Sequence, residues 1–137
     1  MFRHIATKIA FFTGLLITSQ LVAANSHYTI VRARDCLMVM QQDTPVLSYR
    51  ILPLSKDGQY TRNNYVNLYN FQGYEITEDF PADHLHHRGV FWAWHQVIVG
   101  EKYLGDSWEC RNFTWDSKEV TATKQRDGVL LKTRTHW

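Results

Sequence analysis

Alternation of apolar and polar residues is the feature that most constrains the fold of this chain. Beyond the first 24 residues, several segments alternate apolar and polar residues or form short apolar runs, and no apolar stripe with helical spacing is found. Such alternation predicts strands with one buried face. Strands are expected at residues 27–34, 36–41, 46–52, 65–71, 74–77 and 90–99, in a short segment around Tyr103, and at 119–124 and 129–135. The expected fold is therefore all-β, an antiparallel β-sandwich.

Residues 1–24 are predicted to be a signal peptide. A basic start at Arg3 and Lys8 precedes an apolar core, and Val22-Ala23-Ala24 supplies the small residues that a signal peptidase recognises. An uncleaved anchor is the less favoured alternative, because a membrane-spanning helix needs about 20 predominantly apolar residues. Cleavage leaves a β-sandwich domain of residues 25–137 in an exported protein, either periplasmic or secreted.

The mature part of the chain carries no formal net charge. Two of the 15 Lys and Arg residues lie in the signal peptide, which leaves 13 basic residues against 13 acidic ones. A nucleic-acid partner needs a positive face, so none is expected. No second apolar stretch approaches membrane-spanning length, so no membrane contact is expected after signal cleavage.

Three of the seven histidines lie within four residues, at His84, His86 and His87. Imidazole titrates near neutrality and binds metals, so this cluster is the best candidate for a functional site. Charged and aromatic side chains flank it closely. The full candidate set is Asp83, His84, His86, His87, Arg88, Trp92, Trp94 and His95.

One interpretation of this set is a pocket for a small polar ligand, such as a sugar or sugar acid. His84, His86 and His87 are candidate catalytic acids or bases, and the planar fork of Arg88 suits a carboxylate. Trp92 or Trp94 would stack on the ligand ring, with His95 and Asp83 adding polar contacts. By fold-level analogy with exported β proteins that handle sugars, the activity would be that of a carbohydrate-active hydrolase, lyase or epimerase.

A second interpretation is a divalent-metal site in an oxidoreductase. If residues 84–86 are extended, His84 and His86 point to one face and can share an ion. His95 or Asp83 would complete the shell. Asp106 and Glu109 could also supply a carboxylate, but nothing in the sequence places them there.

A third interpretation is a structural β module without catalysis. The imidazoles would then bond to backbone groups, and Asp83 and Arg88 would form an ordinary ion pair. Under every interpretation, Gly89 is expected to permit a tight turn or a close backbone approach.

The two cysteines, Cys36 and Cys110, leave two alternatives open. Export favours one disulfide between them, but two buried free thiols are nearly as well supported by the sequence. Spacing along the chain does not show whether the two Cα atoms meet.

Residues from about 64 to 110 resemble the bacterial family labelled PmoA-like methane oxygenase. The strongest part is Asp79-Phe80-Pro81-Ala82-Asp83-His84-Leu85-His86-His87-Arg88-Gly89-Val90-Phe91-Trp92, which is similar to the family's Asp-His-Pro-His-His-Arg-Gly block and the aromatic strand after it. Leu85 stands where the family usually has Pro, so a less rigid loop is expected. The resemblance implies an exported β-sandwich with its site at the histidine block, in the context of carbohydrate-processing proteins. A methane monooxygenase membrane subunit would need several long apolar helices, which this sequence lacks.

The resemblance also implies that this chain corresponds to the N-terminal half of a larger sandwich. The expected last strand runs to His136-Trp137 without a polar tail, which agrees with that expectation. Exposed sheet edges in an incomplete sandwich would favour a homo-oligomer.

Overall fold

The computed structural model describes residues 27–137, and the described part contains eleven strands and no helix. The predicted signal peptide, residues 1–24, lies outside the described residues. The strands are β1 (Tyr28–Arg32), β2 (Cys36–Gln41), β3 (Thr44–Arg50), β4 (Leu54–Lys56), β5 (Gln59–Arg62), β6 (Tyr65–Leu68), β7 (Val90–Phe91), β8 (Val97–Val99), β9 (Lys102–Gly105), β10 (Asp116–Gln125) and β11 (Gly128–His136). Every strand pair is antiparallel, which confirms the predicted all-β class.

Within residues 27–137, no helix is long and apolar enough to cross a membrane.

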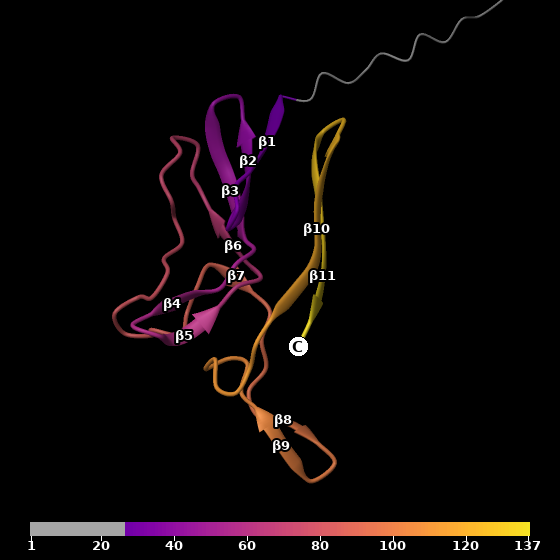
Figure 1. Cartoon of the computed structure of the whole chain (residues 1–137). Helices are drawn as coiled ribbons and strands as arrows, with labels where there is room; N and C mark the ends of the chain where they lie inside the picture. Colours follow the sequence, from indigo (N-terminus) through magenta and orange to yellow (C-terminus); the bar gives the residue numbers. More distant parts are fainter. Residues whose placement is uncertain (1–26) are drawn as a thin grey trace, which may run out of the picture.

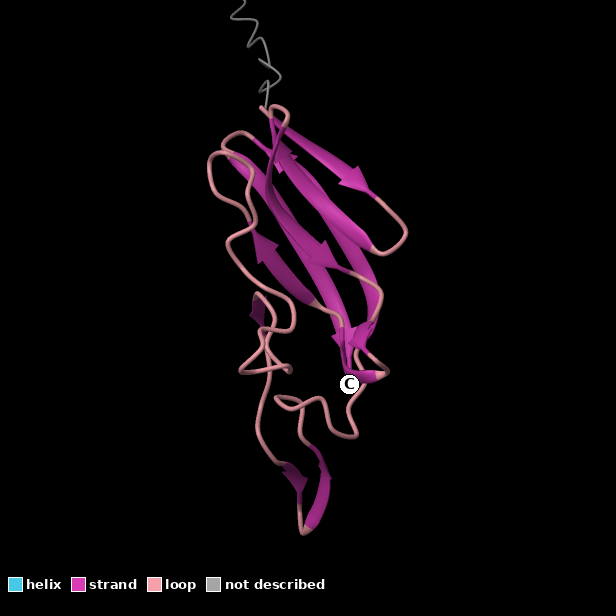
Figure 2. Ribbon diagram, turned by 90° about the vertical axis from the view of Figure 1, so that its left-hand side faces the viewer, coloured by secondary structure: helices cyan, strands magenta, loops and turns pink. Residues whose placement is uncertain are grey.

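Two layers enclose the apolar core. The main sheet has the order β1-β2-β3-β6-β7, and the β10–β11 hairpin lies beside it (Figures 1 and 2). Leu37 on β2 pairs with Tyr49 on β3, so both side chains point to the same face, where they meet Val120 of β10. The guanidinium of Arg32 donates to the carbonyl of Val120 over 2.8 Å and ties β1 to the hairpin.

On the opposite face of the main sheet, β6 is covered by the long loop between β6 and β7. Tyr65 and Asn67 alternate with the core residues of β6 and are buried under this loop. The Tyr65 hydroxyl donates to Asp79 over 2.7 Å, and the Asn67 amide donates to the same carboxylate over 3.4 Å. These bonds place residues 83–89, which we call the histidine block, against the sheet.

The predicted strand 90–99 is wrong in its middle. Only β7 and β8 pair as strands, and the segment between them leaves the ladder. The Trp94 amide donates to the Ser107 hydroxyl over 2.7 Å, and the Trp94 carbonyl accepts from the Trp108 amide over 3.1 Å. Gln96 has a left-handed backbone, with φ of 51°. The backbone of this segment is therefore satisfied by a distant loop rather than by a neighbouring strand.

Two smaller expectations also differ from the structure. Residues 74–77 form no named strand and contribute one isolated bridge, between Tyr69 and Glu75. β4 and β5, which flank the turn at residues 57–58, were not predicted as strands. Both are short, and a run of three or four residues offers too little alternation to detect.

Substitution of Gly89 by alanine tests how the histidine block is seated. A Cβ atom at this position would lie 2.1 Å from the Val66 carbonyl oxygen and 2.5 Å from Oδ1 of Asn67. The close backbone approach expected at Gly89 is thus found. Gly89→Ala should lower the free energy of unfolding by more than about 2 kcal/mol, measured by urea denaturation. Gly128→Ala is the matched control, since a Cβ there meets nothing within 4 Å. Equal stability of the two variants would contradict the close approach.

Candidate functional site

Trp108 is the centre around which the histidines gather. Its ring centroid lies 5.5 Å from those of His87 and His95 and 6.0 Å from that of His86. Phe91 of β7 completes the cluster at 5.5 Å. Three of the predicted site histidines, from two separate stretches of the sequence, therefore meet on one indole.

A closed loop, residues 106–111, carries Trp108. The amide of Asp106 donates to the carbonyl of Arg111, and the amide of Arg111 donates back to the carbonyl of Asp106, each over 2.9 Å. The Glu109 amide donates to Oδ1 of Asp106 over 2.9 Å. This side-chain bond within the turn is the local pattern that favours aspartate at the start of a loop.

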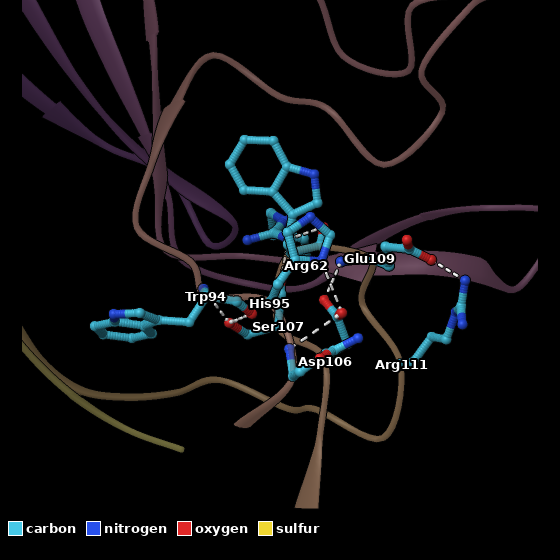
Figure 3. Close-up of polar contacts among 9 residues, drawn as sticks. Arg62, Trp94, His95, Asp106, Ser107, Glu109 and Arg111 are labelled. Atoms are coloured by element: carbon cyan, nitrogen blue, oxygen red, sulfur yellow. Dashed lines mark hydrogen bonds and ion pairs between the residues drawn. The ribbon is translucent and has the colours of Figure 1, made fainter. Parts of the chain in front are cut away.

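The buried side chain of Arg62 supports this loop (Figure 3). Arg62 ends β5, is 1% exposed, and donates to the carbonyls of Ser107 and Trp108. Its guanidinium carbon lies 4.3 Å from the centroid of the Phe91 ring. Nothing in the sequence distinguished Arg62 from a surface arginine, because its partners lie more than 40 residues away.

The Ser107 hydroxyl belongs to the support of the site. Ser107 is fully buried, and its hydroxyl donates to the carbonyl of Trp94 over 3.0 Å while accepting from the Trp94 amide. The hydroxyl thus acts as both donor and acceptor, and it fixes the segment that carries His95.

His95, Asp106 and Glu109 form the polar centre of the site (Figure 3). Nδ1 of His95 lies 2.9 Å from Oδ2 of Asp106, which also accepts from the Gln96 amide over 3.3 Å. Each of the three side chains offers one metal-ligating atom, and these atoms all lie within 4.8 Å of one another. The sequence suggested the residue types but could not place Asp106 and Glu109 beside His95.

The Asp106 carboxylate is held in its charged form. Burial by itself would raise its pKa, but bonds from the Glu109 amide, the His95 ring and the Gln96 amide outweigh burial and lower the pKa to about 2. The carboxylate therefore stays ionised and fixes the orientation of the His95 ring at any physiological pH.

The histidine block is folded differently from the extended segment on which the predicted metal pair depended. The His84 amide donates to the Pro81 carbonyl over 3.0 Å, and the His87 amide donates to the His84 carbonyl over 2.8 Å. These two turns stack His84 on His87, with centroids 4.6 Å apart, and set the His86 ring at 80° to that of His84. In the described part of the chain, the donor group that assembles contains neither His84 nor His86.

His84 and His86 lie in different surroundings. Nδ1 of the exposed His84 is 3.0 Å from Oδ2 of Asp83, and this bond lowers the pKa of Asp83. Nε2 of His86 is buried without a hydrogen-bond partner, and burial together with the nearby His87 lowers the pKa of His86. His86 is therefore neutral near pH 7. It lines an open pocket of about 520 Å³ with Tyr60, Glu109 and Arg111, among others.

Arg88 does not present its guanidinium to a ligand. It is buried, donates to the carbonyls of Tyr60 over 2.6 Å and Leu85 over 3.1 Å, and lies 3.6 Å from the centre of the Phe80 ring. Desolvation lowers its pKa. In this structure the Arg88 donors are turned inward and hold the histidine block together, and the anchoring of a substrate oxygen by Arg88 stays a prediction. Asp83 pairs with His84 rather than with Arg88.

Trp92, Trp94 and Trp137 form a row of exposed indoles beside His95, which we call the indole row. Trp92 is 70% and Trp137 60% exposed. The centroid of Trp94 lies 6.1 Å from that of Trp92 and 5.5 Å from that of Trp137. Trp94, His95 and Trp137 line a second open pocket of about 270 Å³. Trp92 and Trp94 were candidate stacking residues, whereas Trp137 was missed because it follows a distant strand.

Both cysteines are free thiols. The Sγ atom of Cys110 accepts a bond from Arg62 over 3.3 Å, and burial together with Asp35 raises the pKa of Cys36. The disulfide expected from export is not formed in this structure.

Acid denaturation tests the charged state of Asp106. Since its pKa falls from an ordinary value of about 3.9 in the unfolded chain to about 2 in the fold, the stabilisation is complete above about pH 4 and is lost as the pH falls toward 2. Asp106→Asn should lower the free energy of unfolding by on the order of 2 kcal/mol at pH 7. It should also flatten the dependence of that free energy on pH between pH 4 and pH 2. Asp127→Asn, at an exposed pair with Arg126, is the control. A profile of Asp106→Asn that keeps the wild-type slope between pH 4 and pH 2 would contradict the assignment.

Comparison with known proteins gives a family but no function. Residues 36–137 match the model of a family of unknown function, DUF6807. No curated protein and no solved structure matches the chain. The matched region contains β2 to β11 and every site residue described above. The chain therefore belongs to the DUF6807 family.

Proposed function

We propose that the protein binds a sugar or sugar acid at the indole row and acts on it as a hydrolase, lyase or epimerase. The observation that carries the proposal is the exposure of Trp92, Trp94 and Trp137 beside an ordered His95–Asp106 pair. Large aromatic side chains exposed in a contiguous patch mark binding surfaces, because water contact with them is unfavourable. An aromatic pocket with a few fixed polar groups is the usual form of a small-molecule site.

The polar groups beside the indole row suit proton transfer. The ionised Asp106 bonds to Nδ1 of His95 and so orients the ring, as a carboxylate does for a catalytic imidazole. His95 is exposed and lines the same pocket as Trp94 and Trp137. His95 is therefore our candidate acid or base, and Asp106 is its positioning residue.

The sequence block at residues 79–92 supports the same proposal. It resembles the PmoA-like family, whose members are associated with carbohydrate-processing proteins. A signal peptide at residues 1–24 would place the protein in the periplasm or outside the cell, where sugars are encountered. We propose this closer relationship and this location together with the sugar-related activity.

Calorimetric titration with a panel of neutral sugars and sugar acids tests the binding step. At least one member of the panel should bind, and Trp94→Ala should weaken its affinity about ten-fold, since loss of one stacked aromatic contact costs about 1.5 kcal/mol.

Phe71→Ala is the matched control for this titration. Phe71 is an aromatic residue that is 99% exposed but lies on the loop after β6, away from the indole row. Its substitution should leave the affinity unchanged. No binding across the panel, or equal losses in the two variants, would overturn the proposal.

A further inference from the structure

We propose that His95, Asp106 and Glu109 form a site for one divalent transition-metal ion. The inference stands on the geometry of these three residues and does not depend on the sugar-related function. It also differs from the metal site expected at His84 and His86, neither of which belongs to this donor group.

The donor atoms are close enough to bind one ion with little movement. One atom from each side chain lies within 4.8 Å of the others, and Nδ1 of His95 is 2.9 Å from Oδ2 of Asp106. Metal–ligand bonds of about 2.1 Å require neighbouring donors to be about 3 to 4 Å apart. A rotation of the Glu109 side chain is the main adjustment that the site would need.

Backbone amides hold the Asp106 carboxylate in advance, and the loop places Glu109 beside it. Asp106 and Glu109 belong to the closed 106–111 loop, and Asp106 accepts from the amides of Glu109 and Gln96. The His95 ring packs 5.5 Å from the centre of Trp108. Bonds and packing behind the ligands orient them and reduce the entropy that metal binding would otherwise cost.

The surroundings would leave open coordination positions on the ion. Glu109 lines the larger pocket, and His95 lines the pocket beside the indole row, so the ion would lie between two solvent-reachable spaces. His86, whose buried Nε2 has no hydrogen-bond partner, shares the larger pocket with Glu109. Three protein ligands with open positions are typical of a catalytic metal rather than a structural one.

The donor set indicates the class of metal. One imidazole nitrogen and two carboxylate oxygens suit zinc, iron(II), manganese or cobalt, and suit less well the soft ions that need thiolates. The two carboxylates would balance the charge of the ion. Arg111, which pairs with Glu109, is mostly exposed and can move into solvent when a cation takes its place. The loss of such an exposed pair changes stability little.

The test is a titration of chelator-treated protein with Co²⁺ and Zn²⁺, followed by calorimetry and by the visible absorption of bound Co²⁺. One ion should bind per chain. Glu109→Gln and His95→Ala should each weaken the affinity by at least ten-fold, whereas Arg111→Ala should strengthen it several-fold by removing a competing cation. His84→Ala, at the exposed pair with Asp83, is the matched control and should leave the affinity unchanged.

Three results would overturn the inference: no ion bound, an affinity that Glu109→Gln leaves unchanged, or an equal loss in His84→Ala. Sugar titrations of the metal-free protein and of its Trp94→Ala variant distinguish failure of the metal-site inference from failure of the proposed sugar-related function. Affinity for a sugar that depends on Trp94 can persist without any metal, and a metal can bind without any affinity for sugars.

Discussion

The buried guanidinium of Arg62 is the interaction on which the site depends. A charged group removed from water needs polar partners, and Nη2 of Arg62 bonds to the carbonyls of Ser107 and Trp108 and to the sulfur of Cys110. These acceptors belong to the one loop that carries Trp108 and Glu109. The main sheet has its own apolar core around Leu37 and Val39, so the arginine organises the site rather than the sandwich.

The second arginine of the site, Arg88, organises the histidine block in a similar way. It lies against Phe80 and bonds to the carbonyl of Leu85 within the block and to that of Tyr60 on β5. Tyr60 and Phe80 have left-handed backbones, with φ of 51° and 61°. Non-glycine residues take up this conformation at a cost that the surroundings must offset. Two buried cations that bond to backbone carbonyls thus hold irregular loops in place, and the loops, rather than the strands, position the side chains that face the pockets.

The sequence predicts the sheet well because alternation is a local property. The strand at residues 36–41 is found with its predicted bounds, and the predicted hairpin at residues 119–135 forms β10 and β11. The continuous strand at 90–99 fails because Ser107 and Trp108 compete for the backbone of Trp94, and no local pattern reveals a competitor more than ten residues away.

The same distinction between local patterns and long-range contacts applies to the site. The density of imidazoles singled out His86, His87 and His95, and the structure brings these three rings together around Trp108. The roles of the charged residues could not be predicted, because they depend on which way each side chain turns. Arg88 turns inward, and Asp106 meets His95 only because β8 and β9 form a hairpin between them. The aspartate that opens a turn three residues before Glu109 is a local signal that could have indicated the loop, though not its partner.

Hydrogen exchange in an Arg62→Lys variant tests the central claim most directly. Lysine keeps the positive charge, but its side chain is one atom shorter than that of arginine, so it should not reach the carbonyls of Ser107 and Trp108 as Nη2 of Arg62 does, and it lacks the planar group that packs over Phe91. If Arg62 holds the loop, amide exchange in residues 106–111 should become much faster, while the amides of β2 and β3 keep their wild-type protection. Unchanged protection of the loop would contradict the account, and so would an equal loss of protection throughout the main sheet.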